Sequence, residues 1–408
     1  MVPPEPSARR DDRPGAALWV VFLLLPACGY RTALLDASEP SDARAPADTT
    51  DALAETQHAA MAIAAGGCHT CALTTDQRVL CWGCNGEGQL GHAGSGDSAT
   101  PVEVDGPDFR ATAISAGYWN TCAIEASSSL LRCWGMFDAS WYAGGAEAWR
   151  KLDELVLAVG NGDAMSCALT VSGRVLCWDI LQGEPSDWGE AVVAGGPIQI
   201  AGLPTNITAI SLGGYHVSAL TAEGEVICWG SNEFGQLGRD PPGSVVGGPA
   251  PPVPLPPAVS IATGWDHTCA VTVAGEVKCW GWNGFGQLGN NSVLDDTATP
   301  VDVQGLDPDV VRVVSGPENH ATCAVTAAGA VRCWGLVYED LGPGWSNKDG
   351  PVSIPGLDMP IETLAIGGTH ICALTRTNRI LCWGKNDVGQ LGTGSYASSA
   401  RPQFVVGF

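Results

Sequence analysis

The segments His267-Thr-Cys-Ala-Val-Thr272 and Glu276-Val-Lys-Cys-Trp280, followed by Gly-Gln-Leu-Gly at 286–289, decide the fold. Short apolar segments of this kind, bounded by turn residues, predict two β-strands. Between them lies Val273-Ala274-Gly275, a three-residue loop whose glycine can take the left-handed conformation that a tight hairpin needs. The stretch therefore predicts a β-hairpin.

Two further strands complete the unit Val259–Val303. Ser260-Ile261-Ala262 predicts a first strand, which ends before Gly264, and Pro300-Val-Asp-Val303 predicts a fourth. Four short strands make one propeller blade. A single blade leaves apolar faces exposed, and only neighbouring blades can cover them. The unit must therefore be one of several in a ring.

The unit recurs along the chain. Cys-Trp-Gly stands at 81–83, 133–135, 228–230, 279–281, 333–335 and 382–384, and Cys177-Trp178-Asp179 is a seventh, degenerate copy. The second cysteines are 52, 44, 51, 51, 54 and 49 residues apart. A period near 50 is typical of β-propellers. We therefore predict an all-β, seven-bladed propeller over residues 61–408. Its ring is closed by pairing of the two ends of the repeat region, with Arg401–Gly407 returning to the N-terminal unit.

These motifs carry a family resemblance. The succession of Gly, His-Thr-Cys-Ala-Leu-Thr, Val-x-Cys-Trp-Gly-x-Asn and Gly-Gln-Leu-Gly resembles the regulator of chromosome condensation repeat. Gly-Gln-Leu-Gly stands at 88–91, 235–238, 286–289 and 389–392, whereas units two, three and six lack it. The resemblance implies a seven-bladed propeller. The family includes a nucleotide-exchange factor for a small GTPase that also binds chromatin, and a secreted bacterial propeller that inhibits β-lactamases.

Cysteine pairs recur at fixed places in the repeats. In the predicted hairpin Cys269 and Cys279 lie symmetrically about the loop, so they face each other across the strands within disulfide reach. The same reasoning pairs Cys71 with Cys81, Cys122 with Cys133, Cys167 with Cys177, Cys323 with Cys333 and Cys372 with Cys382. In unit four Ser218 stands opposite Cys228, which leaves one unpaired thiol. Sixteen cysteines in this pattern indicate an oxidising compartment.

The first unit contains two further cysteines. Cys68 and Cys84 lie in register with Cys71 and Cys81, so they predict a seventh disulfide. An alternative is a zinc knuckle of the four thiolates beside His69, but the other units repeat the inner pair without the outer one. Histidines also recur with the repeat, at 69, 216, 267 and 370, which favours structural hydrogen bonding over catalysis. We predict no metal and no cofactor.

The N-terminal segment carries export signals. Residues 16–27 form an uncharged apolar run after Arg9, Arg10 and Arg13, a length typical of a signal peptide. Cys28 ends this run after a small residue and resembles a bacterial lipobox cysteine; an ordinary secretory signal is the alternative. Residues 28–60 are rich in Ala, Ser, Thr, Asp and Pro, which predicts a flexible acidic tether. We expect a monomer anchored by lipid at Cys28 in the cell envelope, at the outer membrane or cell surface, and identify it as an exported bacterial member of the family.

Composition restricts the function. The formal net charge is −23, so nucleic acid is an unfavourable partner. The common catalytic and nucleotide-binding motifs are missing, so we predict a non-enzyme. The expected function is an extracytoplasmic scaffold that binds an unknown protein. The alternatives are a propeller that binds or degrades carbohydrate or cell wall, and a guanine-nucleotide exchange factor.

Tryptophans suggest where a partner binds. Seven of the fifteen belong to the repeated Cys-Trp positions and are assigned to blade packing. Trp119, Trp265 and Trp282 lie elsewhere in the units. Loop tryptophans are enriched in binding hot spots. We select those in the divergent stretches as partner-binding candidates: Trp141, Trp149, Trp188 and Trp345.

Overall fold

The structure is a computed structural model. It describes residues 58–94, 96–106, 108–136, 147–148, 154–163, 165–179, 197–239, 243, 248–317, 319–338 and 345–408. For residues 147–148, 179, 338 and 345–346 it describes the backbone alone. Contacts divide the chain into residues 1–38 and 39–408, and all described residues belong to the second unit. No helix in the described part of the chain has the length and apolar character needed to cross a bilayer.

Within the described residues, twenty-seven strands form seven antiparallel sheets, one for each blade. Blade 1 holds β1 (Ala60–Ala65), β2 (His69–Thr74), β3 (Val79–Gly83) and β4 (Ser98–Glu103). Blade 2 holds β5 (Ala111–Ala116), β6 (Asn120–Glu125), β7 (Leu131–Gly135) and β8 (Glu147–Ala148). Blade 3 holds β9 (Val156–Asn161), β10 (Met165–Thr170), β11 (Val175–Asp179) and β12 (Ile198–Gln199). Blade 4 holds β13 (Ile207–Leu212), β14 (His216–Thr221) and β15 (Val226–Gly230).

The last three blades each have four strands. Blade 5 holds β16 (Ala258–Thr263), β17 (His267–Thr272), β18 (Val277–Gly281) and β19 (Thr297–Asp302). Blade 6 holds β20 (Val310–Ser315), β21 (Ala321–Thr326), β22 (Val331–Tyr338) and β23 (Trp345–Ser353). Blade 7 holds β24 (Ile361–Ile366), β25 (His370–Thr375), β26 (Ile380–Gly384) and β27 (Ser399–Phe404). The four strands predicted within Val259–Val303 are thus confirmed as β16 to β19.

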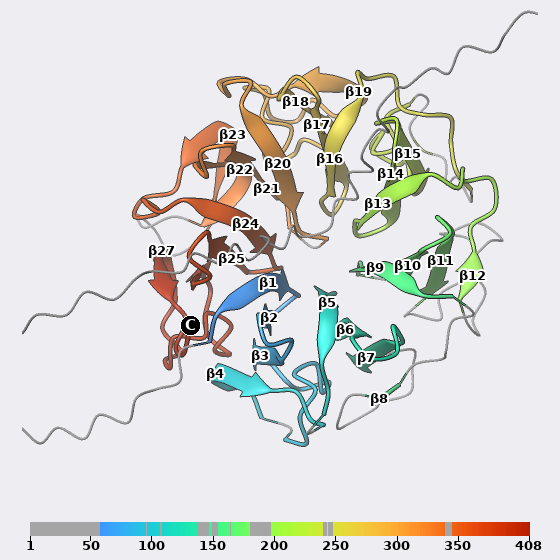
Figure 1. Cartoon of the computed structure of the whole chain (residues 1–408). Coiled ribbons are helices and arrows are strands. Elements are labelled where there is room, and N and C mark those ends of the chain that lie inside the picture. The colour runs from blue at the N-terminus through green and yellow to red at the C-terminus, as the bar shows by residue number, and fades with distance from the viewer. Residues whose placement is uncertain are drawn as a thin grey trace, which may run out of the picture. The chain divides into compact units, whose positions relative to one another are not determined.

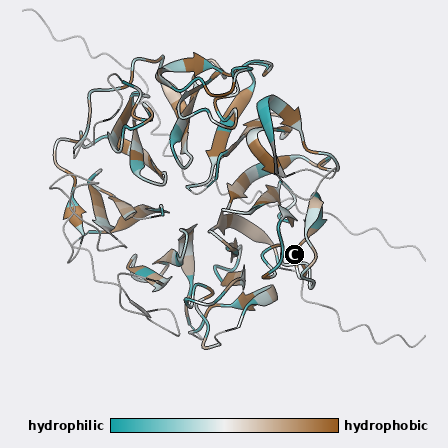
Figure 2. Cartoon of the chain, turned by 180° about the vertical axis from the view of Figure 1, so that it is seen from behind, coloured by the Kyte–Doolittle hydropathy of each residue, from teal (hydrophilic) through white to brown (hydrophobic). Residues whose placement is uncertain are grey.

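The seven blades surround a common centre (Figure 1). The first strand of each blade lies nearest to this centre and contacts the first strands of both neighbouring blades. Hydrophobic residues run along the strands of the blades (Figure 2). The buried clusters join adjacent blades; one, for example, contains Leu374 and Ile380 of blade 7 with Leu80 and Trp82 of blade 1. The predicted seven-bladed propeller is therefore confirmed.

The ends of the ring meet in a way that differs from the prediction. The expected last strand forms as β27, but it pairs with β26 of its own blade, so its predicted pairing with the N-terminal unit was wrong. The residues after β27 make the connection instead: the His58 amide donates to the Gly407 carbonyl (2.6 Å). The Ala60 amide also donates to the Asn378 carbonyl of blade 7 (2.9 Å). In blade 1 the edge of β3 is already taken by β4, so β27 takes the equivalent edge of β26 in its own blade.

A repeated set of hydrogen bonds joins four pairs of consecutive blades, and we call it the clamp. The backbone carbonyl of the glutamine in Gly-Gln-Leu-Gly accepts two hydrogen bonds from the next blade. Gln236 O, for example, accepts from the Trp280 indole and from the Thr268 hydroxyl, both at 2.9 Å. The same contacts join Gln89 to Trp134 and Thr121, Gln287 to Trp334 and Thr322, and Gln390 to Trp82 and Thr70. The repeated tryptophans therefore pack between blades, as predicted.

The recurring histidines complete the clamp. His216 Nε2 lies 2.8 Å from the Thr268 hydroxyl oxygen. Because that hydroxyl donates its proton to Gln236 O, Nε2 must carry the proton of the neutral ring. His69, His267 and His370 make the corresponding contacts with Thr121, Thr322 and Thr70 at 2.6–2.8 Å. The predicted structural role of the histidines is confirmed.

The clamp is missing where the preceding blade lacks Gly-Gln-Leu-Gly. Blades 4 and 7 follow such blades, and they carry Val217 and Ile371 where the clamped blades carry threonine. The indole Nε1 atoms of Trp229 and Trp383 are buried there without a hydrogen-bond partner among the described residues. In these two blades, loss of the acceptor loop in the preceding blade is thus matched by loss of the hydroxyl.

The cysteines occupy directly opposed positions in the hairpins of six blades. Cys269 faces Cys279 in the β17–β18 register, with a Cα–Cα distance of 4.1 Å. The other five predicted pairs stand at 4.0–4.1 Å: Cys71 with Cys81, Cys122 with Cys133, Cys167 with Cys177, Cys323 with Cys333, and Cys372 with Cys382. All six pairs are therefore within disulfide reach, as their spacing predicts.

The pairs hold even where the hairpin or its surroundings depart from the common pattern. Cys133 lies in β7 after a hairpin loop with one extra residue, yet it still stands opposite its partner in β6. Cys333 lies in β22, the third strand of a blade without Gly-Gln-Leu-Gly. Cys382 lies in β26, directly before Trp383, whose indole has no clamp. The cysteine pairing thus depends on the hairpin register and not on the clamp.

Blades 1 and 4 differ from the others in their cysteines. In blade 1 Cys68 and Cys84 form a seventh pair, with a Cα–Cα distance of 5.5 Å. They flank the hairpin strands, where the Cys84 amide donates to the Cys68 carbonyl (2.9 Å). In blade 4 the Ser218 hydroxyl lies 3.2 Å from the Cys228 sulfur, and Cys228 is a buried free thiol.

The clamp predicts unequal effects of one substitution at two equally buried tryptophans. Trp280 and Trp383 are both fully buried, but only Trp280 donates a hydrogen bond through its indole. Trp280→Phe should therefore lower the free energy of unfolding by about 1 kcal/mol more than Trp383→Phe. Denaturant unfolding of the two variants measures the difference, and equal losses would contradict the proposed role of the glutamine carbonyl.

Blade 4 predicts a stabilising substitution. Ser218 and Cys228 face each other in the register that the other blades fill with cysteine pairs. Ser218→Cys should therefore form a further disulfide and raise the free energy of unfolding by up to about 3 kcal/mol. Unfolding with and without reductant measures the gain. A variant that retains two free thiols under oxidising conditions would show that the site does not accept the bridge.

The buried histidines predict a loss of stability in acid. Burial lowers the pKa of His69, His216 and His370 to about 3, and that of His267 well below its ordinary value of 6.5. Below pH 6.5 the unfolded chain therefore binds protons that the folded chain does not. The contribution of each histidine to the free energy of unfolding is fully present above pH 6.5. It decreases by up to about 1.4 kcal/mol for each unit by which the pH falls below that value.

One variant isolates this histidine contribution. Blade 2 carries Asn120 at the histidine position, so His216→Asn uses a residue that the fold already accepts there. Between pH 7 and pH 5, this variant should lose about 1 to 2 kcal/mol less stability than the parent protein. Unfolding curves at the two pH values measure both losses. Identical losses would assign the acid sensitivity to other groups.

Candidate functional site

Most of the partner-binding candidates selected from the sequence lie outside the described residues. This holds for Trp141, Trp149 and Trp188, and also for the predicted lipidation residue Cys28. Trp345 begins β23, where the backbone alone is described. The role predicted for these residues stays a prediction.

A different group of aromatic side chains comes together on blades 4, 5 and 6, and we call it the aromatic surface. All six members are partly exposed. They come from loops between the first and second strands of a blade, or from loops that follow its third strand. The members are Tyr215, Phe234, Trp265, Trp282, Phe285 and His320.

Trp282 lies at the middle of this surface. Its ring centre is 4.7 Å from that of His320, 5.2 Å from that of Phe285 and 6.0 Å from that of Phe234. Trp265 connects the remaining members, since its ring centre is 6.3 Å from that of His320 and 6.0 Å from that of Tyr215. The contacts of Trp282 with His320 and Phe285 are edge-to-face, a geometry that aromatic pairs favour. The surface therefore crosses two blade boundaries.

The clamp glutamine also positions the phenylalanines. The Gln287 side-chain oxygen accepts a hydrogen bond from the Phe285 amide (2.8 Å), and Gln236 does the same for Phe234 (2.9 Å). The equivalent positions in blades 1 and 7 hold Glu87 and Val388. Four blades carry Gly-Gln-Leu-Gly. Among them, blades 4 and 5 alone have an aromatic residue two positions before the glutamine. This signal is readable in the sequence, but a search restricted to tryptophan misses it.

Three carboxylates lie among these rings. Asp266 follows Trp265 in the β16–β17 loop, Glu233 precedes Phe234, and Asp296 accepts a hydrogen bond from the Asn283 amide beside Trp282 (2.8 Å). Burial, followed by repulsion from Glu233 and Asp296, raises the pKa of Asp266 to about 7. Burial lowers the pKa of His320 to about 4, so this ring is neutral at pH 7. The surface therefore combines aromatic rings with negative charge.

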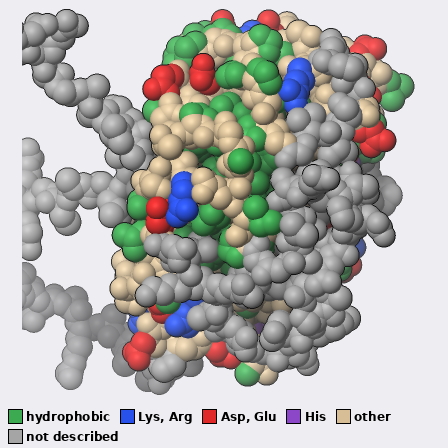
Figure 3. Space-filling view, turned by 90° about the vertical axis from the view of Figure 1, so that its right-hand side faces the viewer, with side chains coloured by type: hydrophobic (Ala, Val, Ile, Leu, Met, Phe, Trp, Pro, Cys, Tyr) green, Lys and Arg blue, Asp and Glu red, His purple; other side chains and the backbone are tan. Residues whose placement is uncertain are grey.

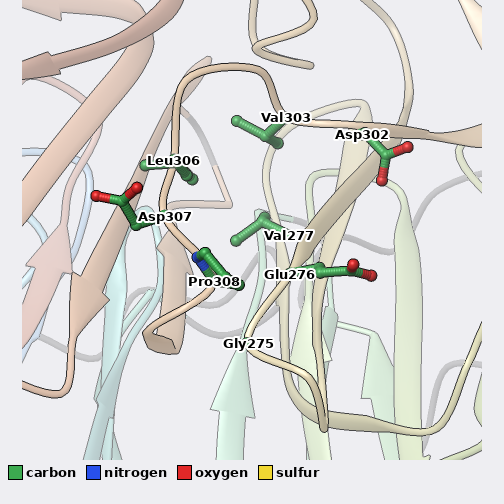
Figure 4. Close-up of a pocket in the computed structure, with 8 residues that line it drawn as sticks. All are labelled: Gly275, Glu276, Val277, Asp302, Val303, Leu306, Asp307 and Pro308. Carbon is green, nitrogen blue, oxygen red and sulfur yellow. The ribbon is translucent and has the colours of Figure 1, made fainter.

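A concavity lies at the other end of blade 5, between the β17–β18 turn and the segment after β19. It has a volume of about 170 Å³. Apolar side chains occupy its centre and carboxylates stand at its sides (Figure 4). Its lining residues are Gly275, Glu276, Val277, Asp302, Val303, Leu306, Asp307 and Pro308. The Lys278 ammonium pairs with Asp302 at 2.5 Å, so one of its carboxylates is already neutralised.

The described residues contain no group of three or more His, Cys, Asp or Glu side chains arranged to hold a metal ion. The four cysteines of the possible zinc knuckle instead pair two by two, Cys68 with Cys84 and Cys71 with Cys81. Basic side chains are also scattered: on the side of the ring in Figure 3, the described lysines and arginines stand singly. On this side, the described basic residues do not form the basic stripe typical of nucleic-acid binding.

Comparisons with known protein families find matches in the blades that carry Gly-Gln-Leu-Gly. The regulator of chromosome condensation (RCC1) repeat matches residues 62–89, 207–236, 258–287 and 361–390 in one form. In a second form it matches residues 76–124, 223–271, 274–324 and 377–408. The matched segments contain each Gly-Gln-Leu-Gly loop and each clamp histidine.

Individual relatives share similar stretches. The ultraviolet-B receptor UVR8 of Arabidopsis thaliana is 27% identical over 364 residues, which cover 84% of this chain and 81% of the receptor. The E3 ubiquitin-protein ligase HERC2 of Homo sapiens is 28% identical over 82% of this chain, but the match covers 7% of the ligase. The mitochondrial RCC1 domain-containing protein RUG3 of Arabidopsis thaliana is 31% identical over 54% of each chain.

Solved structures show the same fold. Human WBSCR16 superposes with a TM-score of 0.70 at 21% identity, covering 81% of this chain and 94% of its own. Prp20p of Saccharomyces cerevisiae, described with its binding to Gsp1p and histones, superposes with a TM-score of 0.50 at 21% identity. That match covers 84% of this chain and 76% of Prp20p.

Proposed function

The chain belongs to the regulator of chromosome condensation repeat family, and from this premise we propose that it is a protein-binding scaffold whose aromatic surface contacts the partner. The observation that carries this proposal is the group of six partly exposed rings around Trp282. Tryptophan and tyrosine are enriched in binding hot spots, because they combine a large apolar area with few rotatable bonds.

The contrast between two kinds of tryptophan supports this assignment. Trp280 is fully buried and held by the clamp, so it is committed to the ring. Trp282, two residues later, is partly exposed and packs against other partly exposed rings. The propeller needs buried tryptophans such as Trp280 to hold its blades together. Partly exposed tryptophans such as Trp282 are available to a partner. The role is one of binding, and the ligase activity named for HERC2 is not carried over, since the match covers 7% of that protein.

The proposal also gives the protein a place in the cell envelope. The apolar run at 16–27 and Cys28 at its end support export and lipid anchoring. Seven opposed cysteine pairs support an oxidising compartment, where such pairs form disulfides. The tether 28–60 then separates the propeller from the membrane. A flexible chain of that length has a root-mean-square reach of roughly 30 Å.

Affinity capture tests the binding surface. The full chain, its Trp282→Ala variant and its Val273→Ser variant are each used to capture proteins from the envelope of the source cells. Val273 is a matched control, because it is 66% exposed and lies in the β17–β18 turn of the same blade. A saturable protein partner should be kept by Val273→Ser and lost, with at least about a tenfold drop in affinity, by Trp282→Ala. Equal capture by both variants would refute the assignment, and a captured glycan would favour the carbohydrate-binding alternative.

A second experiment tests the anchor separately. Cys28→Ser removes the only side chain in the proposed lipobox that can carry a thioether-linked lipid, so it should move the protein from the membrane fraction to the soluble or precursor pool. Metabolic labelling with a fatty acid and fractionation measure the change. Unchanged acylation and fractionation would show that Cys28 is not the anchor, without affecting the binding proposal.

A further inference from the structure

Three acidic side chains at the aromatic surface have no cation beside them among the described residues. Burial, followed by repulsion from Glu233 and Asp296, raises the pKa of Asp266. The ion pairs of the described residues involve other carboxylates, such as Glu103 with Arg78 and Asp302 with Lys278. Gln236 Nε2 is a neutral donor to Asp266, at a long 3.4 Å. The negative charge therefore lacks a partner within the described part of the chain.

The aromatic rings beside these carboxylates are also suited to binding a cation. The face of a tryptophan or phenylalanine ring attracts a cation electrostatically, and the attraction grows when water is excluded. Trp265 precedes Asp266 in the chain, and Trp282 donates its backbone amide to the Asp266 carbonyl (2.9 Å). Aromatic rings and a carboxylate thus meet at one place, a combination well suited to organic cations.

Other occupants fit this chemistry less well. The three carboxylates do not form a metal-holding group, although they are near enough to repel one another. A neutral sugar would stack on the rings and leave the carboxylates uncompensated. An acidic ligand would add to the repulsion. A long cationic side chain reaches the carboxylates and covers the rings with its methylene groups.

We propose that the aromatic surface receives a lysine or arginine side chain of the protein partner, held against the Trp265 and Trp282 rings by the carboxylate of Asp266. This inference deepens the proposed function and rests on it for the identity of the partner as a protein. It assigns a basic segment to the partner and makes Asp266 the residue that selects it. Glu233 and Asp296 strengthen the attraction from the edges of the surface.

The site makes binding depend on pH. Burial and neighbouring charge hold the pKa of Asp266 at about 7 in the free protein. A bound cation favours the ionised carboxylate, so affinity should rise as the pH increases from 6 to 8. Among the described residues, the other titratable groups around Asp266 are Glu233, Asp296, His267 and His320. Neither histidine titrates in this range, because burial lowers the pKa of His320 to about 4 and that of His267 well below 6.5.

The experiment uses the full chain and a peptide of defined charge. The probe is a Gly/Ser peptide with three spaced lysines, and its comparison is the same peptide with each lysine acetylated. Binding is followed by tryptophan fluorescence and calorimetry at pH 6 and pH 8. The variants are Asp266→Asn, Trp282→Ala and the control Asp307→Asn. Asp307 is an exposed residue of the concavity at the other end of blade 5, so its replacement changes the net charge equally.

We expect Asp266→Asn and Trp282→Ala to weaken binding of the lysine peptide about tenfold. Asp307→Asn should change it less than about twofold, as expected of one exposed charge. The acetylated peptide should bind at least about tenfold more weakly than the lysine peptide. The pH dependence should vanish in Asp266→Asn. Equal weakening by Asp266→Asn and Asp307→Asn would reduce the effect to general attraction by an acidic protein and overturn the proposal, as would equal binding of the acetylated peptide.

This result is separable from the capture experiment. If capture finds a partner that depends on Trp282 but is insensitive to Asp266→Asn, the scaffold function stands and the cation site is refuted. If the lysine peptide binds as expected but no protein is captured, the cation site stands and the scaffold function fails.

Discussion

At four blade boundaries a single backbone carbonyl, that of the glutamine in Gly-Gln-Leu-Gly, accepts hydrogen bonds from the next blade. It accepts one hydrogen bond from a buried indole and another from a buried hydroxyl, both of which belong to the following blade. Both donors would carry a desolvation penalty without it. The loop that carries the carbonyl is itself held by an asparagine: the Asn283 side-chain oxygen accepts from the Leu288 amide at 3.1 Å. The position of each loop is therefore fixed by its own blade. The hydrogen bonds to its glutamine carbonyl come from the next blade.

The same loop connects the fold to the candidate site. In blade 5 the glutamine side chain holds the Phe285 amide while its backbone carbonyl serves blade 6. The aromatic surface is consequently built on a loop with two fixed points. Surfaces that bind proteins tightly tend to be rigid before the partner arrives, since less conformational freedom is lost on binding. The clamp glutamines supply this rigidity to Phe234 and Phe285.

The repeat pattern made the fold predictable, whereas the site depended on departures from that pattern. The strands of Val259–Val303, the mismatch of Ser218 with Cys228 and the packing role of Trp280 all follow from repeat positions, because identical units must solve the same packing problem. The edge taken by β27 also follows from the repeat, since β4 already pairs with β3 in blade 1, and the expected pairing with that blade overlooked this. Phe234 and Phe285 were missed for another reason: a ring's value for binding comes from its neighbours across blade boundaries, and His320 lies 35 residues from Phe285 in the chain.

The directionality of the clamp bears on how such a ring can be redesigned. Each Gly-Gln-Leu-Gly loop serves the blade after it, so replacing that loop removes an acceptor from a neighbour that the designer did not touch. Blades 2, 3 and 6 lack the motif, and the blades after them have Ser166, Val217 and Ile371 at the position of the clamp threonine. New loops grafted after the third strands of these three blades would leave every existing clamp in place. Loops in blades 2, 3 and 6 can therefore vary without affecting a clamp. A change in a Gly-Gln-Leu-Gly loop removes hydrogen bonds from the next blade.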